Sequence, residues 1–307
     1  MNIPIYYLNK FVKHVREGTL RRRYEQAITQ CRWTFLERWW INQARTRQYF
    51  DYEVEPDVWL RLHFNSAMAW DIYCHDHELA ERAFLRRVLR PGDTFIDVGA
   101  NLGLYSIIAS RLVGPKGFVC AFEPDPVVYS RLRFNLHNNG CSNVKAFQLA
   151  LSNINETRVM QISNSGYDAY NSFGTPVRGG GTFEAREVAC VRYDSFVEHE
   201  PKLANPTMIK VDVEGWESMV LRGAVEHLSR ENAPLLQLEF NDEAARSVGR
   251  RCSELYKWLT SLGYSIYTFD PRSRELIPHP LLNYYVYDNV LATKNIDSLK
   301  KLVGSRT

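Results

Sequence analysis

The sequence predicts an α/β fold, in which helices cover both faces of a mostly parallel sheet. Three observations predict it. Short apolar runs alternate with helical patterns from residue 76 onward, with short turns between them. The first apolar run ends in a glycine turn, a feature of strand-to-helix connections in such sheets. The chain has 307 residues, 45% of them hydrophobic, which is enough for one large packed domain.

Local patterns predict the elements in chain order. Residues 76–92 carry acids at the start, bases at the end and a Pro91-Gly92 stop, which indicates a helix. Further helices are expected at 101–113, 125–140, 214–228 and 253–263. Strands are expected at 94–100, 117–124, 144–152, 207–213, 234–240, 264–269 and 284–293. Because no helix separates the last two strands, we expect an antiparallel end to the sheet.

An insertion interrupts the alternation between residues 152 and 207. Residues 156–163 and 187–193 have the pattern of two paired strands. Between them, residues 164–181 are rich in Gly, Ser, Asn and Tyr, which is typical of a functional or a surface loop. We expect this loop to overhang the site, with Tyr167, Tyr170 and Phe173 available to stack on a ring.

The N-terminal part of the chain is basic. Residues 1–50 hold ten Lys or Arg and three Glu, whereas the whole chain has a net charge of only +3. Apolar residues recur there every three or four residues, which predicts amphipathic helices. We therefore expect residues 1–75 to form a basic helical segment and residues 76–307 to form the main domain. The helices could pack on the main domain, or they could provide peripheral contact with an acidic membrane surface.

The composition favours a soluble protein of the cytoplasm. The six cysteines are scattered without a CxxC pair, and no apolar run is long enough to span a bilayer. The first residues lack the apolar stretch and small-residue cleavage site of a secretion signal. The small net charge gives no reason to expect a nucleic-acid partner, and the sequence makes no prediction of the oligomeric state.

The turn after the first strand carries most of the chemical information. It reads Asp97-Val98-Gly99-Ala100-Asn101-Leu102-Gly103, and Asn101 stands where a dinucleotide fingerprint has its second glycine. The turn also lacks the Gly-Lys-Ser/Thr sequence that holds nucleotide phosphates. Glu123, at the end of the second strand, can accept the hydroxyls of a ribose. Carboxylates around such a site suit a cationic adenosine derivative, and S-adenosyl-L-methionine (SAM) is one.

Five separated motifs together resemble the FkbM-type family of SAM-dependent methyltransferases. They are FIDVGANLGLYS, EPDP, ALS, IKVDVEGWESMVLRGA and PLLQLEF, in that family's order, and the resemblance covers about residues 78–292. It implies a class I methyltransferase fold, which is a Rossmann-like sheet of seven strands with an antiparallel last strand. It also implies methyl transfer from SAM to a hydroxyl oxygen of a sugar, glycan or other small natural product.

The resemblance implies a set of cofactor-binding residues at the matching positions. They are Glu78, Asp97, Gly99, Ala100, Asn101, Gly103, Glu123, Pro124, Ala150, Leu151 and Ser152. Several have a purely structural alternative: the glycines could serve a tight turn, Asn101 could cap a helix, and Glu78 could be a first-turn helix acid. Likewise, Glu123 could be a solvated loop acid.

Charged residues at two neighbouring strand ends are the catalytic candidates. Lys210, Asp212 and Glu214 alternate along an extended chain, and Glu239 ends the next strand. We expect Asp212 or Glu214 to accept the proton of the acceptor hydroxyl, and Glu239 to position the acceptor. The alternatives are a buried ion pair of Lys210 with Glu239 and a helix-start role for Glu214. Such carboxylates could also hold Mg²⁺, but we assign no metal ligand.

Three other functions compete with this prediction. A nucleic-acid methyltransferase would use the basic N-terminal segment, and its affinity for RNA would fall steeply with salt. A nicotinamide-dependent oxidoreductase conflicts with Asn101 in the glycine turn. A module that binds SAM without chemistry would leave Asp212 and Glu214 dispensable.

Overall fold

The computed structural model describes residues 34–75, 77–163, 168, 171–175 and 182–304. The chain divides into two compact units, Met1–Tyr49 and Phe50–Thr307. In the first unit, residues 34–44 are helical; the helices predicted before residue 34 lie outside the described residues. Across the described part of the chain, no helix has the length and apolar character needed to cross a membrane.

Residues 49–75 differ from the predicted helical segment. They contain strands β1 (Tyr49–Glu55) and β2 (Val58–His63), which form a two-stranded sheet, followed by helix α3 (Ala67–His75). β2 alternates buried and more exposed residues in the sequence VWLRLH, a period of two that indicates a strand. The compact unit that holds the main fold therefore begins at Phe50 rather than at residue 76.

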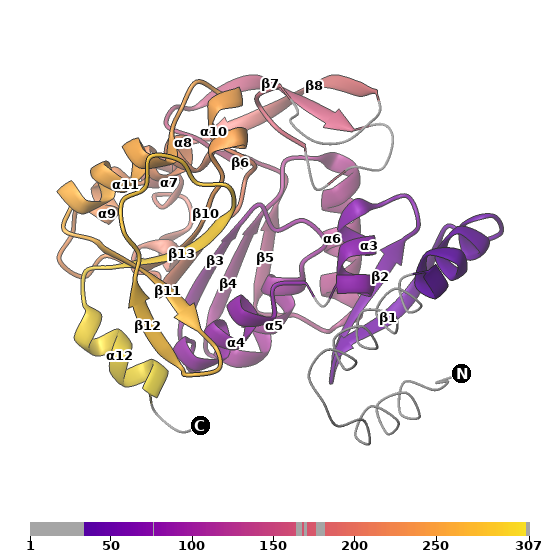
Figure 1. Cartoon of the computed structure of the whole chain (residues 1–307), viewed down its shortest axis with the longest axis horizontal. Helices are drawn as coiled ribbons and strands as arrows, with labels where there is room; N and C mark the ends of the chain where they lie inside the picture. Colours follow the sequence, from indigo (N-terminus) through magenta and orange to yellow (C-terminus); the bar gives the residue numbers. More distant parts are fainter. Residues whose placement is uncertain (1–33, 76, 164–167, 169–170, 176–181, 305–307) are drawn as a thin grey trace, which may run out of the picture. The chain divides into compact units, whose positions relative to one another are not determined.

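A mixed sheet of eight strands organises the second unit (Figure 1). Its order is β12 (Glu275–Pro278), β11 (Ser265–Asp270), β13 (Asp288–Thr293), β10 (Leu235–Phe240), β9 (Met208–Val211), β3 (Thr94–Val98), β4 (Phe118–Phe122) and β5 (Val144–Phe147). The five strands from β10 to β5 are parallel, and β13 runs antiparallel between β10 and β11. This confirms the predicted α/β class and its antiparallel last strand.

The eighth strand, β12, was not predicted. It pairs antiparallel with β11 at the edge of the sheet, so the two form a hairpin. Its four residues, ELIP, are mostly exposed and end in proline. Such a short edge strand lacks the apolar run by which the seven other strands are recognised.

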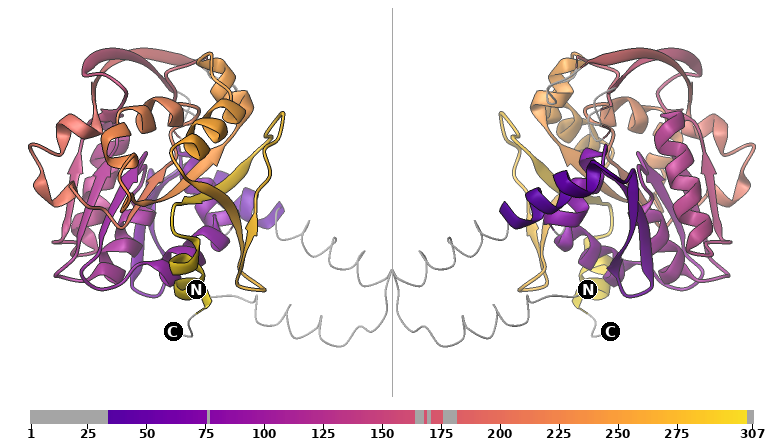
Figure 2. Two further views of the ribbon diagram at one scale, coloured as in Figure 1. Left: turned by 90° about the vertical axis from the view of Figure 1, so that its left-hand side faces the viewer. Right: turned by 90° about the vertical axis from the view of Figure 1, so that its right-hand side faces the viewer.

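Helices cover both faces of this sheet (Figures 1 and 2). They are α4 (Leu79–Val88), α5 (Leu104–Val113), α6 (Pro126–Asn138), α7 (Tyr193–Phe196), the 3₁₀ helix η2 (Pro201–Leu203), α8 (Glu217–Arg222), α9 (Val225–Leu228), α10 (Asp242–Ser247), α11 (Cys252–Ser261) and α12 (Ile296–Gly304). Local signals explain where some of them start. Before α6, the Asp125 carboxylate accepts the amides of Val127 and Val128, and Pro126 takes the first helical position.

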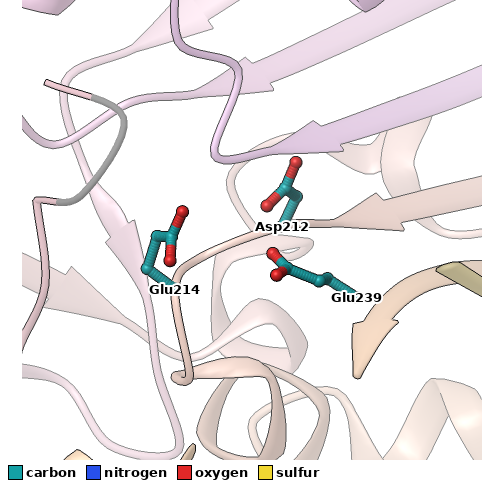
Figure 3. A group of neighbouring side chains, drawn as sticks. All are labelled: Asp212, Glu214 and Glu239. Atoms are coloured by element: carbon teal, nitrogen blue, oxygen red, sulfur yellow. The ribbon is translucent and has the colours of Figure 1, made fainter. Parts of the chain in front are cut away.

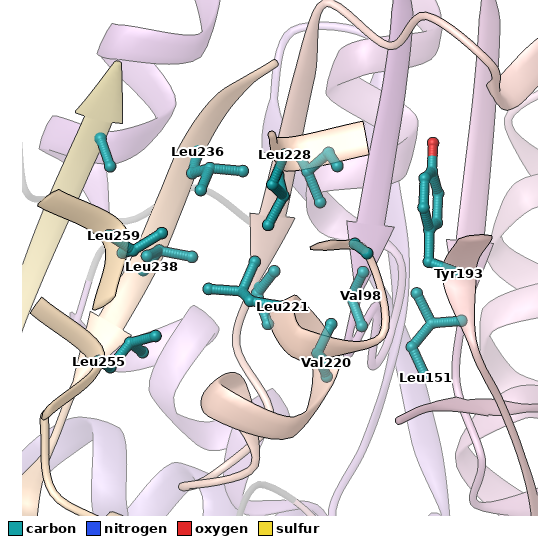
Figure 4. Packing of buried hydrophobic residues seen from close by; sticks show 14 of the residues in the cluster. Val98, Leu151, Tyr193, Val220, Leu221, Leu228, Leu236, Leu238, Leu255 and Leu259 are labelled. Carbon is teal, nitrogen blue, oxygen red and sulfur yellow. The ribbon is translucent and has the colours of Figure 1, made fainter. Parts of the chain in front are cut away.

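The main hydrophobic core lies between one face of the sheet and α8, α9 and α11 (Figure 4). It contains, among others, Val98, Leu151, Tyr193, Val220, Leu221, Leu228, Leu236, Leu238, Leu255 and Leu259. Because side chains alternate along a strand, Ile96 and Val98 enter this core while Asp97 points to the opposite face. The core thus fixes the strands whose polar residues form the site.

A separate sheet of three strands is built from the insertion. β6 (Ala150–Leu151) pairs parallel with β8 (Phe183–Val191), and β8 pairs antiparallel with β7 (Glu156–Ser163). The predicted strand pair is confirmed, although β8 begins earlier than expected. The single strand predicted over 144–152 is instead two strands: after Phe147 the chain leaves the central sheet, and Ala150 and Leu151 pair with β8.

Candidate active site

Strand register aligns the polar residues of the site. Asp97 pairs with Ala121 on one side and Lys210 on the other, and Lys210 pairs with Gln237. Two residues further along each parallel strand, at the carboxyl ends, stand Glu123, Gly99, Asp212 and Glu239. The carboxyl ends of parallel strands are where ligands bind in open α/β sheets.

The glycine turn brings the chain close to the neighbouring strand. Gly99 has a φ of +80°, and a Cβ there would lie 1.9 Å from the carbonyl oxygen of Asp212. Its amide and that of Ala100 donate to the carbonyl of Phe122. Gly103, with a φ of +91°, packs against Leu132. Both glycines therefore serve the tight turn between strand and helix. Gly99 also lines both pockets of the site.

Asn101 does not cap the following helix, so that alternative is wrong. The position before α5 is Gly103, whereas Asn101 lies two residues earlier with a φ of +47°. Its backbone amide donates to Oε2 of Glu123, 3.1 Å away. Its side-chain oxygen is buried and has no hydrogen-bond partner among the residues that the structure describes. A buried oxygen of this kind is available to a ligand that donates a hydrogen bond.

Glu123 is buried rather than solvated, so the loop-acid alternative is also wrong. Its two carboxylate oxygens accept the backbone amides of Asn101 and Asp125, at 3.1 and 2.9 Å. Burial raises the pKa of Glu123 to about 8, although the two amides act in the opposite direction. Each oxygen retains a second lone pair for a hydroxyl of a ligand.

Two adjoining pockets open around the turn, of about 560 and about 330 Å³ counting space open to solvent. The larger pocket is lined by Val98, Gly99, Asn101, Phe122, Glu123, Pro124, Leu149, Ala150, Leu151, Met160, Asp168, Asn171, Phe173, Asp212, Val213, Glu214 and Trp216. Among these described residues are four carboxylates and no lysine or arginine. The larger pocket is therefore built for a ligand that is not an anion.

The smaller pocket shares Gly99, Asn101 and Asp212 with the larger one. It is further lined by Met68, Ile72, His77, Asp97, Ala100, Leu102, Leu104, Tyr105 and Lys210. One oxygen of Asp97 accepts the Ser106 hydroxyl at 2.6 Å, while the other is buried and unpaired within the described part of the chain. Burial raises the pKa of Asp97, and the nearby Lys210 charge opposes that rise. The smaller pocket thus holds charges of both signs.

Glu78 contacts His77, which lines the smaller pocket. It precedes α4 with a φ of +51°, and its carboxylate lies 3.3 Å from Nε2 of His77. Burial disfavours its charge, but the hydrogen bond from His77 and the Lys210 charge hold the pKa of Glu78 below its ordinary value. Three predicted cofactor-binding residues, Glu78, Gly103 and Ser152, and the predicted catalytic Glu239 are outside the lining of both pockets as far as the chain is described.

The three predicted catalytic carboxylates come together. Asp212, Glu214 and Glu239 each offer an oxygen, and these oxygens lie within 4.8 Å of one another (Figure 3). Lys210 pairs with Asp212 at 2.7 Å rather than with Glu239, so the ion pair considered for Glu239 is wrong. Glu214, with a φ of +50°, lies in the turn before α8 and not in its first turn.

The environments of these carboxylates differ. Glu239 is only 6% exposed, and burial together with the Asp212 and Glu214 charges raises its pKa well above the ordinary value. The Asp212 side chain is 24% exposed and keeps a cationic partner in Lys210. Asp212, bonded to a cation, and Glu239, whose charged form burial disfavours, are therefore suited to different parts of a proton transfer. Three carboxylate oxygens this close are also the kind of ligands that Mg²⁺ takes.

The insertion contributes residues that sequence reasoning missed. Asp168 and Asn171 line the larger pocket together with the predicted Phe173, so the described part of the loop does overhang the site; Tyr167 and Tyr170 lie outside the described residues. Asp168 pairs with Arg131 at 3.0 Å, and Asn171 donates to Asp125 at 2.7 Å.

Trp216 was missed as well. The centroid of its ring lies 4.8 Å from that of the Phe173 ring. Its position directly after the Glu214-Gly215 turn was the available signal, because that turn follows a strand end at the site.

A parallel sheet with a glycine turn and an acid-lined pocket beyond its carboxyl ends defines an α/β protein of the class that binds nucleoside-type cofactors. Comparison with known families is more specific. Residues 97–266 match the model of the methyltransferase FkbM domain, and the chain belongs to this family.

Curated relatives are similar over part of their length. Methyltransferase sdnD of Sordaria araneosa is 34% identical over 164 residues, which are 44% of this chain and 62% of that protein. Hexuronic acid methyltransferase AglP of Haloferax volcanii is 28% identical over 48% of this chain and 56% of its own length. The chain thus spans about 60% of the length of these relatives. The crystal structure of methyltransferase FkbM from Methylobacillus flagellatus KT aligns with a TM-score of 0.41 at 17% identity, covering 73% of this chain and 54% of that one.

Proposed function

We propose that this protein is a SAM-dependent methyltransferase that methylates a hydroxyl oxygen of a small molecule or glycan. One observation carries the proposal: the larger pocket presents Glu123, Asp168, Asp212 and Glu214 with no basic side chain among its described lining residues. Diphosphate cofactors need bare backbone amides or cations at this place, whereas SAM carries a sulfonium and an ammonium.

The residues present fit SAM across both pockets. The Glu123 oxygens are available to the ribose hydroxyls, and Leu149, Ala150 and Phe173 offer an apolar lining for adenine. In the smaller pocket, Asp97 can take the ammonium and Lys210 can take the carboxylate of the methionine part. When bound, SAM supplies an electrophilic methyl group on sulfur.

The protein's own task is to position the acceptor and to remove its proton. A hydroxyl becomes more acidic as it attacks carbon, so a carboxylate within hydrogen-bond reach accelerates the reaction. We assign this role to Asp212, which is partly exposed and oriented by Lys210. Burial and the neighbouring carboxylates raise the pKa of Glu239, so this group favours its protonated form and can then donate a hydrogen bond to the acceptor oxygen. Glu214 is the alternative base, since it reaches the same point.

Transfer of a labelled methyl group tests the proposal. The purified chain would be incubated with SAM carrying a tritiated methyl group and with sugars, uronic acids, hydroxylated polyketides or RNA. We expect label in a hydroxylated small molecule or glycan. Label in RNA alone, falling steeply with added salt, would support the nucleic-acid methyltransferase instead.

A further inference from the structure

The segment between β12 and β13 exposes an unusual number of apolar side chains. Residues 280–287 read PLLNYYVY and contain no charged residue. Five large apolar residues among these eight are between 37% and 69% exposed, and we call them the apolar rim: Leu281, Leu282, Tyr284, Val286 and Tyr287. Contiguous exposed apolar groups on a protein surface usually mark a binding site.

Tyr285, in the middle of this segment, fixes the rim to the end of β10. Its amide donates to Oδ2 of Asp242 at 2.9 Å, and its carbonyl accepts the Asp242 amide at the same distance. Its ring is fully buried and packs edge-on against Phe240. Asp242 follows Glu239 by three residues, so the rim is held beside the carboxylates; Figure 1 shows the loop before β13, in yellow, next to α10.

Strand register places Tyr287 near the carboxyl end of β10. Asn289 lies opposite Glu239 in the β10–β13 pair and donates to Glu81 at 3.1 Å and Glu78 at 3.4 Å. Tyr287 directly precedes β13, whose first residue, Asp288, pairs with Phe240 next to Glu239, so Tyr287 lies at the same edge of the sheet as the carboxylates. Burial and the carboxyl groups of Glu78, Asp212 and Glu239 raise the pKa of the Tyr287 phenol.

The rim meets the acceptor if the proposed function holds, and the inference rests on that function. SAM would occupy the two pockets, and an acceptor must then reach Asp212 and Glu239 from outside them. Tyr287, which is 49% exposed, lies at the edge of the sheet that such an acceptor would approach. We propose that the apolar rim binds the apolar body of an amphiphilic acceptor and directs its hydroxyl to Asp212, with Val286 and Tyr287 as specificity-determining residues.

Binding of two glucosides to the full chain saturated with S-adenosylhomocysteine tests this inference. Octyl β-D-glucopyranoside, below its micelle concentration, has the proposed apolar body, and methyl β-D-glucopyranoside has the same sugar without it. We expect the octyl compound to bind about tenfold or more tightly, because several methylene groups leave water. Calorimetry or saturation-transfer NMR gives both affinities.

Variants locate the apolar contact. Val286→Ser combined with Tyr287→Ser should remove most of the preference for the octyl glucoside, and Tyr287→Phe should retain it. Ile154→Ser, a change at a side chain that is 45% exposed on the turn before β7, is the matched control and should leave the preference unchanged. Affinity for S-adenosylhomocysteine reports whether each variant is folded.

Equal affinity of the wild type for both glucosides, or a preference that survives the double substitution, would overturn the inference while leaving the proposed function intact. A wild-type chain that does not bind S-adenosylhomocysteine would refute the proposed function itself, and the acceptor role of the rim with it.

Discussion

Lys210 and Asp212 form an ion pair at the centre of the site, with Nζ 2.7 Å from Oδ2. The lysine is 5% exposed, lies over the Tyr105 ring, and is held charged by Asp212, Glu78 and Asp97, which raise its pKa despite burial. Asp212 thus has a cationic partner, whereas Glu239 has no comparable ion pair within the described chain, and burial raises its pKa. Because Lys210 pairs with Asp212 and not with Glu239, the two neighbouring carboxyl groups are suited to different roles.

The first prediction concerns Asp212. Asp212→Asn should lower kcat by about 10²- to 10⁴-fold, because general-base catalysis contributes that much, and it should change the affinity for S-adenosylhomocysteine little. Single-turnover methyl transfer and calorimetry measure the two quantities. Asp297→Asn on the exposed face of α12 is the control. An equal loss of binding and turnover would remove Asp212 from the catalytic role.

The second prediction follows from the buried carboxyl of Glu123. Its pKa is about 8 in the folded protein against 4.5 as the ordinary value, so the folded state binds the proton more tightly. The contribution of this group to stability is fully present below pH 4.5 and is lost as the pH rises to about 8. Glu123→Gln cannot ionise, so the Tm of the wild type should fall relative to that of the variant between pH 5 and 8. Parallel pH dependences of the two Tm values would contradict this.

The third prediction separates two reasons for glycine at position 99, which are its positive φ and the lack of space for a Cβ. Gly99→Ala places a Cβ 1.9 Å from the Asp212 carbonyl oxygen in addition to a positive φ, whereas Gly249 has a φ of +72° with nothing within 4 Å. We expect Gly249→Ala to cost about 1 kcal/mol and Gly99→Ala to cost several times more and to abolish cofactor binding. Chemical unfolding measures both. Similar costs would show that close approach to β9 is not the constraint.

The fourth prediction concerns the loop over the larger pocket. Arg131 and Asp168 are 11% and 8% exposed, so Arg131→Met leaves a buried carboxylate without its cation. Loss of one partner of such a pair costs about 3 to 5 kcal/mol, and we expect lower thermal stability together with weaker S-adenosylhomocysteine binding. Arg133→Met, on the exposed side of α6, should change neither. An unchanged affinity in Arg131→Met would separate Asp168 from the cofactor site.

The sequence predicts the parts of this fold that depend on local patterns. β3, β4, β9 and β10 are buried apolar runs, and their strand ends bring Asp97, Glu123, Asp212 and Glu239 to one edge by geometry alone. β12 was missed because an exposed edge strand needs no apolar run. The break after Phe147 was missed because it depends on pairing with β8, some forty residues later in the chain.

Site residues from the insertion depend on tertiary contacts in the same way. Asp168 reaches the larger pocket because Arg131 on α6 holds it there, and Asn171 because it bonds Asp125. Neither partner is recognisable from the loop sequence. A matching motif position does not ensure that a residue lines the pocket. Glu78 and Ser152 match the family's positions, but neither lines the pockets of the described chain.

Calorimetric titration of the purified chain with S-adenosylhomocysteine, NAD and NADP, repeated with Glu123→Ala, tests whether the acid-lined pocket binds SAM rather than a dinucleotide. We expect micromolar binding of S-adenosylhomocysteine, no response to either dinucleotide, and an affinity reduced about tenfold or more in the variant, since Glu123 can bond both ribose hydroxyls and each bond contributes about 0.5 to 1.5 kcal/mol. Binding of NAD or NADP without any response to S-adenosylhomocysteine would contradict this expectation.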